Sequence, residues 1–189
     1  MTSLLKRSAE VKMRLAEACG GDILAAATEI STCFQEGGKV LLCGNGGSAT
    51  DCQHMAAEFV SRLTSAFDRP GLPAIALTTD SSFLTAYAND CGYDGVFERQ
   101  VQALGRPEDL LIGISTSGSS RNVVLAVEQA NRIGMKTIGL TGHRGELQSL
   151  CDVTIAVPDD STQHVQESHL AIEHVLCELV EIQLFNDRP

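Results

Sequence analysis

The chain has 189 residues, 43% hydrophobic and 20% charged, a balance that fits one globular domain with a substantial core. Its formal net charge of -10 argues against a protein that follows nucleic-acid phosphates, because such proteins draw most of their affinity from Lys and Arg. A small phosphorylated ligand is compatible with this charge, since it needs only a few local donors.

The order of the predicted elements indicates the fold class. Residues 2–36 are expected to form one or two amphipathic helices, and residues 164–186 one long terminal helix. Between them, nearly continuous apolar runs are typical of parallel strands that are covered on both faces, and they occur at 39–44, 73–78, 109–115, 136–142 and 152–158. Further helices are expected at 48–64, in two pieces within 81–104, and at 121–133. This alternation predicts a single α/β domain over 1–189, with a doubly wound, parallel five-stranded sheet and flanking helices in a core at 37–158.

The cysteines and the length of the apolar runs indicate the cellular compartment in which the protein is expected. No segment approaches the roughly 20 apolar residues of a membrane span, and the N-terminal residues carry charges throughout. The cysteines are scattered, odd in number and never spaced as C-x-x-C, which indicates a reducing compartment. We therefore expect a cytoplasmic protein with no membrane or nucleic-acid partner. These cysteines are Cys19, Cys33, Cys43, Cys52, Cys91, Cys151 and Cys177.

A glycine-rich loop follows the first predicted strand and opens the helix at 48–64. Its residues are Gly44, Asn45, Gly46, Gly47 and Ser48. Glycines allow close backbone approach, and a helix N-terminus offers free N–H groups to an anion. The spacing is not that of a dinucleotide-binding G-x-G-x-x-G, so the loop alone fits a plain turn as well as a ligand cradle.

A second loop, between the strand at 109–114 and the helix that starts near Arg121, is rich in hydroxyl groups. It consists of Ser115, Thr116, Ser117, Gly118, Ser119 and Ser120. No lysine is present, so it is not a P-loop. A solvated turn with Ser120 as the helix cap needs only one or two of these hydroxyls. The loop therefore favours a cradle of O–H and N–H donors around a phosphate.

With both loops in view, the chain resembles the sugar isomerase (SIS) family of phosphosugar-binding proteins, and within it the phosphoheptose isomerases. The matching segments are GGKVLLCGNGGSATDCQHMAAEF (37–59), RPGLPAIALTTD (69–80), ANDCGYDGVFERQVQALG (88–105), LLIGISTSGSSRNV (110–123) and VQESHLAIEH (165–174). The resemblance implies an enzyme that isomerises sedoheptulose 7-phosphate to D-glycero-D-manno-heptose 7-phosphate in bacterial heptose biosynthesis, for lipopolysaccharide, capsule or another glycoconjugate. It also implies a homotetramer with sites at subunit interfaces, and the apolar positions of the two terminal helical stretches fit a partner surface.

Two helices carry the residues of interest for catalysis. His54 and Glu58 are one turn apart on the helix at 48–64, a spacing suited to one metal ion, although an isolated pair of this kind is usually an exposed one. On the terminal helix, periodicity alone groups Gln166, His169 and Glu173. The resemblance instead pairs Gln166 with His174, and these lie about 12 Å apart along a straight helix. An irregular helix, two inward-leaning side chains, a single tight ligand or a neighbouring chain would each relieve this separation.

The resemblance also implies roles for these residues. It makes His54, Glu58, Gln166 and His174 the ligands of one zinc ion per subunit, with mixed N and O donors. Glu58 becomes the base and His174 its acid–base partner, with Glu58 bound only weakly to the metal. The implied sugar-binding residues are Asn45, Gly46, Gly47, Ser48, Glu58, Arg62, Asn89, Asp90, Ser115, Thr116, Ser117, Ser120 and Gln166.

Some of these assignments have structural alternatives. Asn89 and Asp90 also fit a simple turn. Arg62, one turn beyond Glu58 on the expected helix, could hold that carboxylate or the ligand. His143 and His164 are interpreted as surface residues, and His169 as a packing or hydrogen-bonding residue.

Two other functions were weighed against the enzyme. A related group of non-catalytic SIS proteins serves as adaptors of the bacterial replication initiator, and it lacks the glutamate and the final histidine of the metal set. This chain has both, as Glu58 and His174, which favours the enzyme. Phosphosugar-sensing regulators usually carry a DNA-binding domain as well, for which an acidic chain of 189 residues is expected to leave no room.

Overall fold

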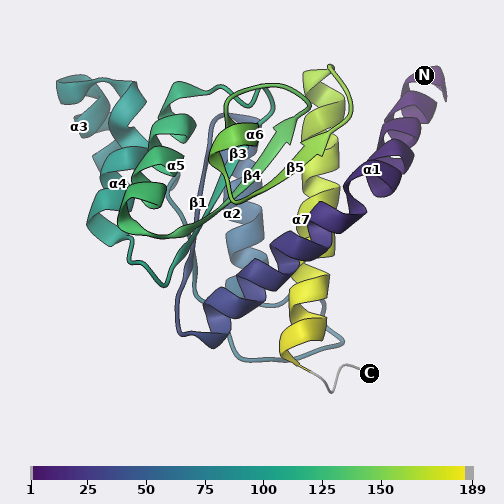
Figure 1. Ribbon diagram of the computed structural model, residues 1–189, viewed down its shortest axis with the longest axis horizontal. Coiled ribbons are helices and arrows are strands. Elements are labelled where there is room, and N and C mark those ends of the chain that lie inside the picture. Colours follow the sequence, from purple (N-terminus) through teal and green to yellow (C-terminus); the bar gives the residue numbers. More distant parts are fainter. Residues whose placement is uncertain (1, 186–189) are drawn as a thin grey trace.

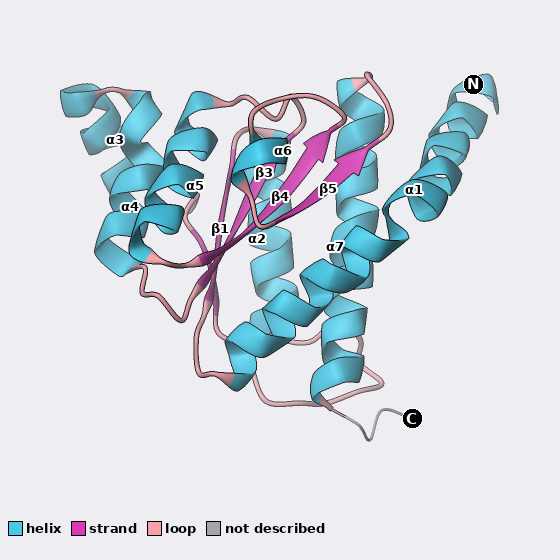
Figure 2. Cartoon of the chain, in the orientation of Figure 1, coloured by secondary structure: helices cyan, strands magenta, loops and turns pink. Residues whose placement is uncertain are grey.

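Five parallel strands form the centre of the protein, as the sequence predicts (Figure 2). The computed structural model describes residues 2–185. The strands are hydrogen-bonded in the order β2-β1-β3-β4-β5. Their bounds are β1 Val40–Gly44, β2 Ala74–Ala76, β3 Leu110–Ser115, β4 Lys136–Gly142 and β5 Val153–Val157.

Helices cover both faces of this sheet, so the fold has three layers (Figure 1). One face packs against α1 (Thr2–Gln35), α2 (Gly47–Val60) and α7 (Thr162–Leu184), and the other against α4 (Val96–Leu104), α5 (Arg121–Ile133) and the short α6 (Leu147–Leu150). Alternate residues of β1 enter the two cores, Leu42 on the α1 side and Leu41 on the α5 side. Two-sided burial explains why β1 is apolar throughout.

The first helical stretch is one helix rather than two. It runs through Gly20 and Gly21, although glycine inside a helix costs roughly 1 kcal/mol relative to alanine. Val11, Leu15 and Ile30 on its inner face are buried against the sheet and α7. This packing holds the helix together across the glycine pair.

Some predicted boundaries were wrong. The helix expected at 48–64 ends at Val60, and α6 was not predicted. Two separate helices within 81–104 are confirmed, as α3 (Ser81–Cys91) and α4, with a single 3-10 turn at Tyr93–Gly95 between them. The terminal helix begins at Thr162 and ends at Leu184, and residue 186, where it was expected to end, lies outside the described residues.

The strand order places the glycine-rich loop at 44–48 and the hydroxyl-rich loop at 115–120 next to each other at one edge of the sheet. β1 and β3 are neighbours, with Gly44 paired to Ile114, and the helices that follow them, α2 and α5, lie on opposite faces. In open α/β sheets, ligands bind beyond the carboxyl ends of the strands at such a switch point. Within residues 2–185, none of the helices combines the length and apolar character that a membrane crossing requires.

Candidate active site

The glycine-rich loop and the start of α5 are joined by a pair of amides. Asn45 Nδ2 donates to Asn122 Oδ1 at 2.8 Å, and Asn122 Nδ2 donates back to Asn45 Oδ1 at 2.8 Å. The Tyr93 hydroxyl also donates to Asn45 Oδ1, at 3.3 Å. Asn122 is buried. Asn45, which the resemblance assigns to the sugar, is therefore already part of a network that holds the two loops side by side.

The hydroxyls of the second loop converge on one another. Ser115 Oγ lies 3.0 Å from Ser120 Oγ and 3.3 Å from Ser117 Oγ, and the Ser119 backbone N–H donates to Ser117 Oγ at 3.2 Å. Ser120 precedes α5, but its side chain makes no capping hydrogen bond. Its hydroxyl is thus oriented into the loop instead of onto the helix end. A cluster of this kind at a helix N-terminus suits a phosphate.

The faces of α2 and α7 meet beside these loops. His54 Nε2 lies 2.9 Å from His174 Nε2, and Gln166 Nε2 donates to both carboxylate oxygens of Asp51 at 2.8 and 2.9 Å. These four side chains, with Gly47, Thr50 and Leu170, line an open pocket of about 560 Å³. The helix α7 is continuous, so Gln166 and His174 contact α2 at separate levels, about two turns apart. Both contacts are made within one chain.

Two glutamates in this region have buried carboxyl oxygens without hydrogen-bond partners among the described residues. Glu58 Oε2 is buried and has no hydrogen-bond partner among the described residues, and the same holds for both oxygens of Glu173. Burial, and to a lesser extent the nearby Asp51 carboxylate, raise the pKa of Glu173 to about 9. Burial also raises the pKa of Asp51, against the hydrogen bonds from Gln166. Buried carboxyl groups without partners, or with raised pKa values, are typical of functional sites.

His169, which periodicity groups with Gln166 and Glu173, is fully buried. Burial lowers its pKa to about 4, so that the ring is neutral at pH 7. His169 faces the core, while Gln166 and His174 line the pocket. Among residues 2–185, no group of three or more His, Cys, Asp or Glu side chains is close enough to hold a metal ion.

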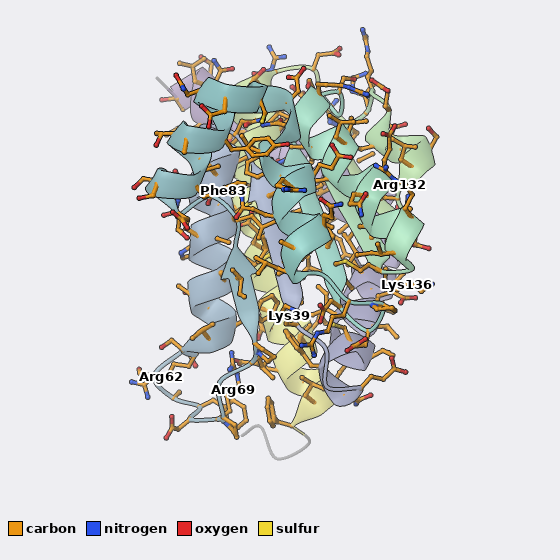
Figure 3. The ribbon with its side chains drawn as sticks, turned by 90° about the vertical axis from the view of Figure 1, so that its left-hand side faces the viewer. Lys39, Arg62, Arg69, Phe83, Arg132 and Lys136 are labelled. Carbon is orange, nitrogen blue, oxygen red and sulfur yellow. The ribbon has the colours of Figure 1, made fainter. Side chains whose placement is uncertain are left out.

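The two arginines near the end of α2 have different environments (Figure 3). Arg62 lies beyond the helix end, so its expected position one turn past Glu58 on the helix was wrong, and it forms an exposed ion pair with Asp68 at 3.7 Å. Arg69 is buried beside α7, where its Nε lies 2.7 Å from Glu181 Oε1. Its other nitrogens donate to the backbone carbonyls of Glu58 and Phe59, both at 2.8 Å. Arg69 therefore ties the last turn of α2 to α7.

The other residues singled out from the sequence differ in their exposure. Asn89 and Asp90 lie in the last turn of α3, where Asn89 Nδ2 donates to Asp90 Oδ1 at 2.8 Å, and so they do not form the turn that was the alternative. His143 is exposed, and His164 is half-buried beside Asp159. Gly46 has a φ of 57°, which favours glycine at that position, and Ser48 is buried at the start of α2.

Three residues in the site were not found from the sequence. Asp51, Asn122 and Arg69 each act through a partner that lies far away in the chain: Gln166, Asn45 and Glu181. The sequence signal was weak, because Asp and Asn near a helix start also serve as ordinary capping residues. Only the spacing of Asp51 and His54, three residues apart on one helix, pointed to a shared face.

The comparisons with known proteins agree with this geometry. Residues 5–142 match the model of the SIS domain, so the fold and its two loops define an SIS-domain protein. The phosphoheptose isomerase of Roseiflexus sp. (strain RS-1) is 52% identical over 184 residues, which cover 97% of this chain and 92% of that protein. The one of Burkholderia pseudomallei (strain 1710b) is 58% identical over 151 residues, or 79% and 76% of the two chains. The structure of a phosphoheptose isomerase from Francisella tularensis superposes with a TM-score of 0.91, at 39% identity over 96% of each chain. The chain belongs to the phosphoheptose isomerase family.

Proposed function

We propose that this protein is the aldose–ketose isomerase that converts sedoheptulose 7-phosphate to D-glycero-D-manno-heptose 7-phosphate in heptose biosynthesis. The observation that carries the proposal is the meeting of α2 and α7, where His54 Nε2 and His174 Nε2 are 2.9 Å apart. Glu58, whose Oε2 is buried, lies one turn from His54 on α2. An adaptor or a passive phosphosugar-binding protein has no need for a carboxylate and an imidazole beside the ligand pocket.

The proposed roles follow from the chemistry of the reaction. Isomerisation of a 2-ketose removes a proton from C1, passes through an enediol and returns a proton to C2. Glu58 takes and returns the carbon-bound proton, because its Oε2 has no partner among residues 2–185 to compete for it. His174 moves the proton between the oxygens of C1 and C2. The hydroxyl loop at 115–120 holds the phosphate at the other end of the sugar, and Asn45, Gly46, Gly47 and Ser48 flank it.

We also propose one zinc ion per subunit, held by His54, Glu58, Gln166 and His174. The donor set suits zinc, since imidazole nitrogens and a carboxylate are among its preferred ligands, and the unpartnered Glu58 oxygen lies on the same helix as His54. Gln166 would bind the metal through its Oε1, which is a different atom from the Nε2 that donates to Asp51. When bound, the ion would polarise the oxygens at C1 and C2.

Assembly belongs to the same proposal. Several large apolar side chains on the outer faces of α1 and α7 are exposed, namely Leu4, Leu5, Met13, Leu24, Val175 and Ile182. Between these helices runs an apolar groove of about 440 Å³, and patches of this kind are typical of subunit interfaces. We propose a cytoplasmic homotetramer in which neighbouring chains complete the sites. Light scattering at increasing dilution, with the isomerase assay alongside, tests it: monomers with full activity would contradict the shared site.

One assay tests the central function. Purified protein is incubated with sedoheptulose 7-phosphate, and NMR follows the appearance of the aldose, with and without a chelator. We expect turnover that the chelator abolishes and that added zinc restores. Binding of the phosphosugar without any turnover under zinc-replete conditions would favour the adaptor instead.

A further inference from the structure

The hydroxyl loop packs against a segment of backbone that has no role in the proposed function. After β4, residues 142–147 turn back and lie against the loop from the side of β4; we call this segment the brace. The Gly142 N–H donates to the Thr116 carbonyl at 3.2 Å, and the Leu147 N–H donates to the Gly118 carbonyl at 3.0 Å. Brace and loop are therefore joined at both ends of the contact by backbone hydrogen bonds.

Between these two bonds, a pair of glycines lets the backbones approach very closely. Gly118 has a φ of 67°, and a Cβ there would lie 2.3 Å from the Arg144 carbonyl oxygen. Gly145 has a φ of 105°, and a Cβ there would lie 2.5 Å from the Ser117 carbonyl oxygen and from the Gly118 carbonyl carbon. No other residue fits at either position without displacement of one backbone by the other.

This contact bears directly on the hydroxyl cluster. Ser117 and Gly118, against which Gly145 is packed, form the tip of the turn that brings Ser117 Oγ to Ser115 Oγ and Ser119 N–H. At Gly145 the brace presents only backbone to the loop, so this contact acts through shape, whereas the His143 and Arg144 side chains line a neighbouring pocket with Thr116 and Ser117. Donors that are already held in position bind an anion more tightly than donors that must be ordered on binding.

We propose that Gly145 is a positioning residue for phosphate binding: the brace holds the hydroxyl loop in the conformation in which its donors converge. This inference rests on the phosphate site of the proposed function. It assigns a role to a residue that does not itself reach the ligand.

The test compares two glycine variants at positions where φ is positive. Gly145→Ala adds a methyl group against Ser117, whereas in Gly134→Ala, at a φ of 85°, the nearest atom to the new Cβ is 3.9 Å away. Calorimetric titration with inorganic phosphate, and KM and kcat for sedoheptulose 7-phosphate, are measured for both variants and for the wild type. We expect Gly145→Ala to weaken phosphate binding and raise KM about tenfold or more, the effect of losing one hydrogen bond to a charged group, with kcat within about threefold. Gly134→Ala should keep the affinity within about twofold, because its strain lies away from the loop.

Equal affinities for the two variants, or a fall in kcat without a change in KM, would overturn the inference, and so would a wild type that binds no phosphate. A wild type that binds phosphate but does not isomerise the sugar removes the proposed reaction and leaves the inference standing. Should Gly145→Ala fail to fold, Gly142→Ala decides, because its Cβ would press on the Thr116 carbonyl oxygen from 2.8 Å. An unchanged phosphate affinity in that variant would refute the brace.

Discussion

The hydroxyl loop and the α2–α7 face are built in opposite ways. The loop consists of six consecutive residues, of which Ser115, Ser117 and Ser120 join their hydroxyls, and two backbone hydrogen bonds tie it to the brace. The α2–α7 face joins residues more than 100 positions apart, as in His54 with His174, and it contains buried carboxyl oxygens without partners among residues 2–185. Polar groups that already have hydrogen-bond partners are typical of a site prepared for binding. Buried polar groups without partners destabilise the fold, and a bound ligand or metal would offset that cost.

The strongest test of this contrast is Glu58→Gln. The variant keeps the shape of the side chain but removes the base, and general-base catalysis contributes about 10²–10⁴-fold to a rate. We expect kcat to fall by about that factor, while inorganic phosphate binds as it does to the wild type. The NMR assay and calorimetry measure the two quantities. A parallel loss of phosphate affinity would mean that the two regions are not separable.

The buried ion pair at the base of the α2–α7 face should contribute most to stability. Arg69 and Glu181 are both buried, and removal of one partner of such a pair costs about 3–5 kcal/mol. Arg69→Met is therefore expected to lower the free energy of unfolding in urea by about that amount. The double variant Arg69→Met with Glu181→Met should regain part of the loss. If the single variant unfolds like the wild type, the pair does not hold α2 against α7.

Substitutions in the hydroxyl loop are expected to weaken phosphosugar binding with little effect on the stability of the fold. Replacement of Thr116 and Ser120 by alanine removes two proposed phosphate donors, each worth about 1.5–3 kcal/mol when the partner is charged. Phosphosugar affinity should fall accordingly, and the melting temperature should change little. His54→Ala serves as the contrasting variant, since it should leave phosphate affinity intact but reduce bound zinc in elemental analysis. Unchanged affinity in the double alanine variant would remove the argument for a hydroxyl cradle.

The smallest expected effect concerns the anchor of α7. Asp159 Oδ1 accepts from the Ser161 N–H at 2.9 Å and Oδ2 from Arg14 at 2.8 Å, and these bonds, the first above all, lower its pKa. A lowered pKa gives stability that is present above the ordinary carboxyl pKa near 4 and is lost as pH falls through the folded value. Asp159→Asn keeps an acceptor for the Ser161 N–H but loses the charge opposite the largely exposed Arg14. It should thus cost about 0.2–1 kcal/mol at pH 7, and less and less below about pH 4. Urea titrations at pH 7 and pH 3 measure this difference; an equal cost at both would exclude the charge as the cause.

Much of this protein follows from its sequence. The apolar runs predicted all five strands and their parallel arrangement, because a strand buried on both faces is mostly apolar. The hydroxyl loop was recognisable from Ser115 to Ser120 because its donors are consecutive in the chain. The glycine-rich loop was ambiguous alone, and only its position beside β3 in the sheet makes it part of a site.

The tertiary structure decided how distant side chains combine. Periodicity along the terminal helix grouped Gln166 with His169 and Glu173, yet packing places His169 and Glu173 in the core, while Gln166 and His174 line the pocket. Three further features depend on where α7 lies against α2. They are the end of α2 at Val60, the hydrogen bonds from Arg69 to its last turn, and the hydrogen bonds between Gln166 and Asp51. The spacing of residues predicts which of them share a helix face. Which other element packs against that face depends on how the whole chain buries its apolar surface, and so these contacts could not be predicted from spacing alone.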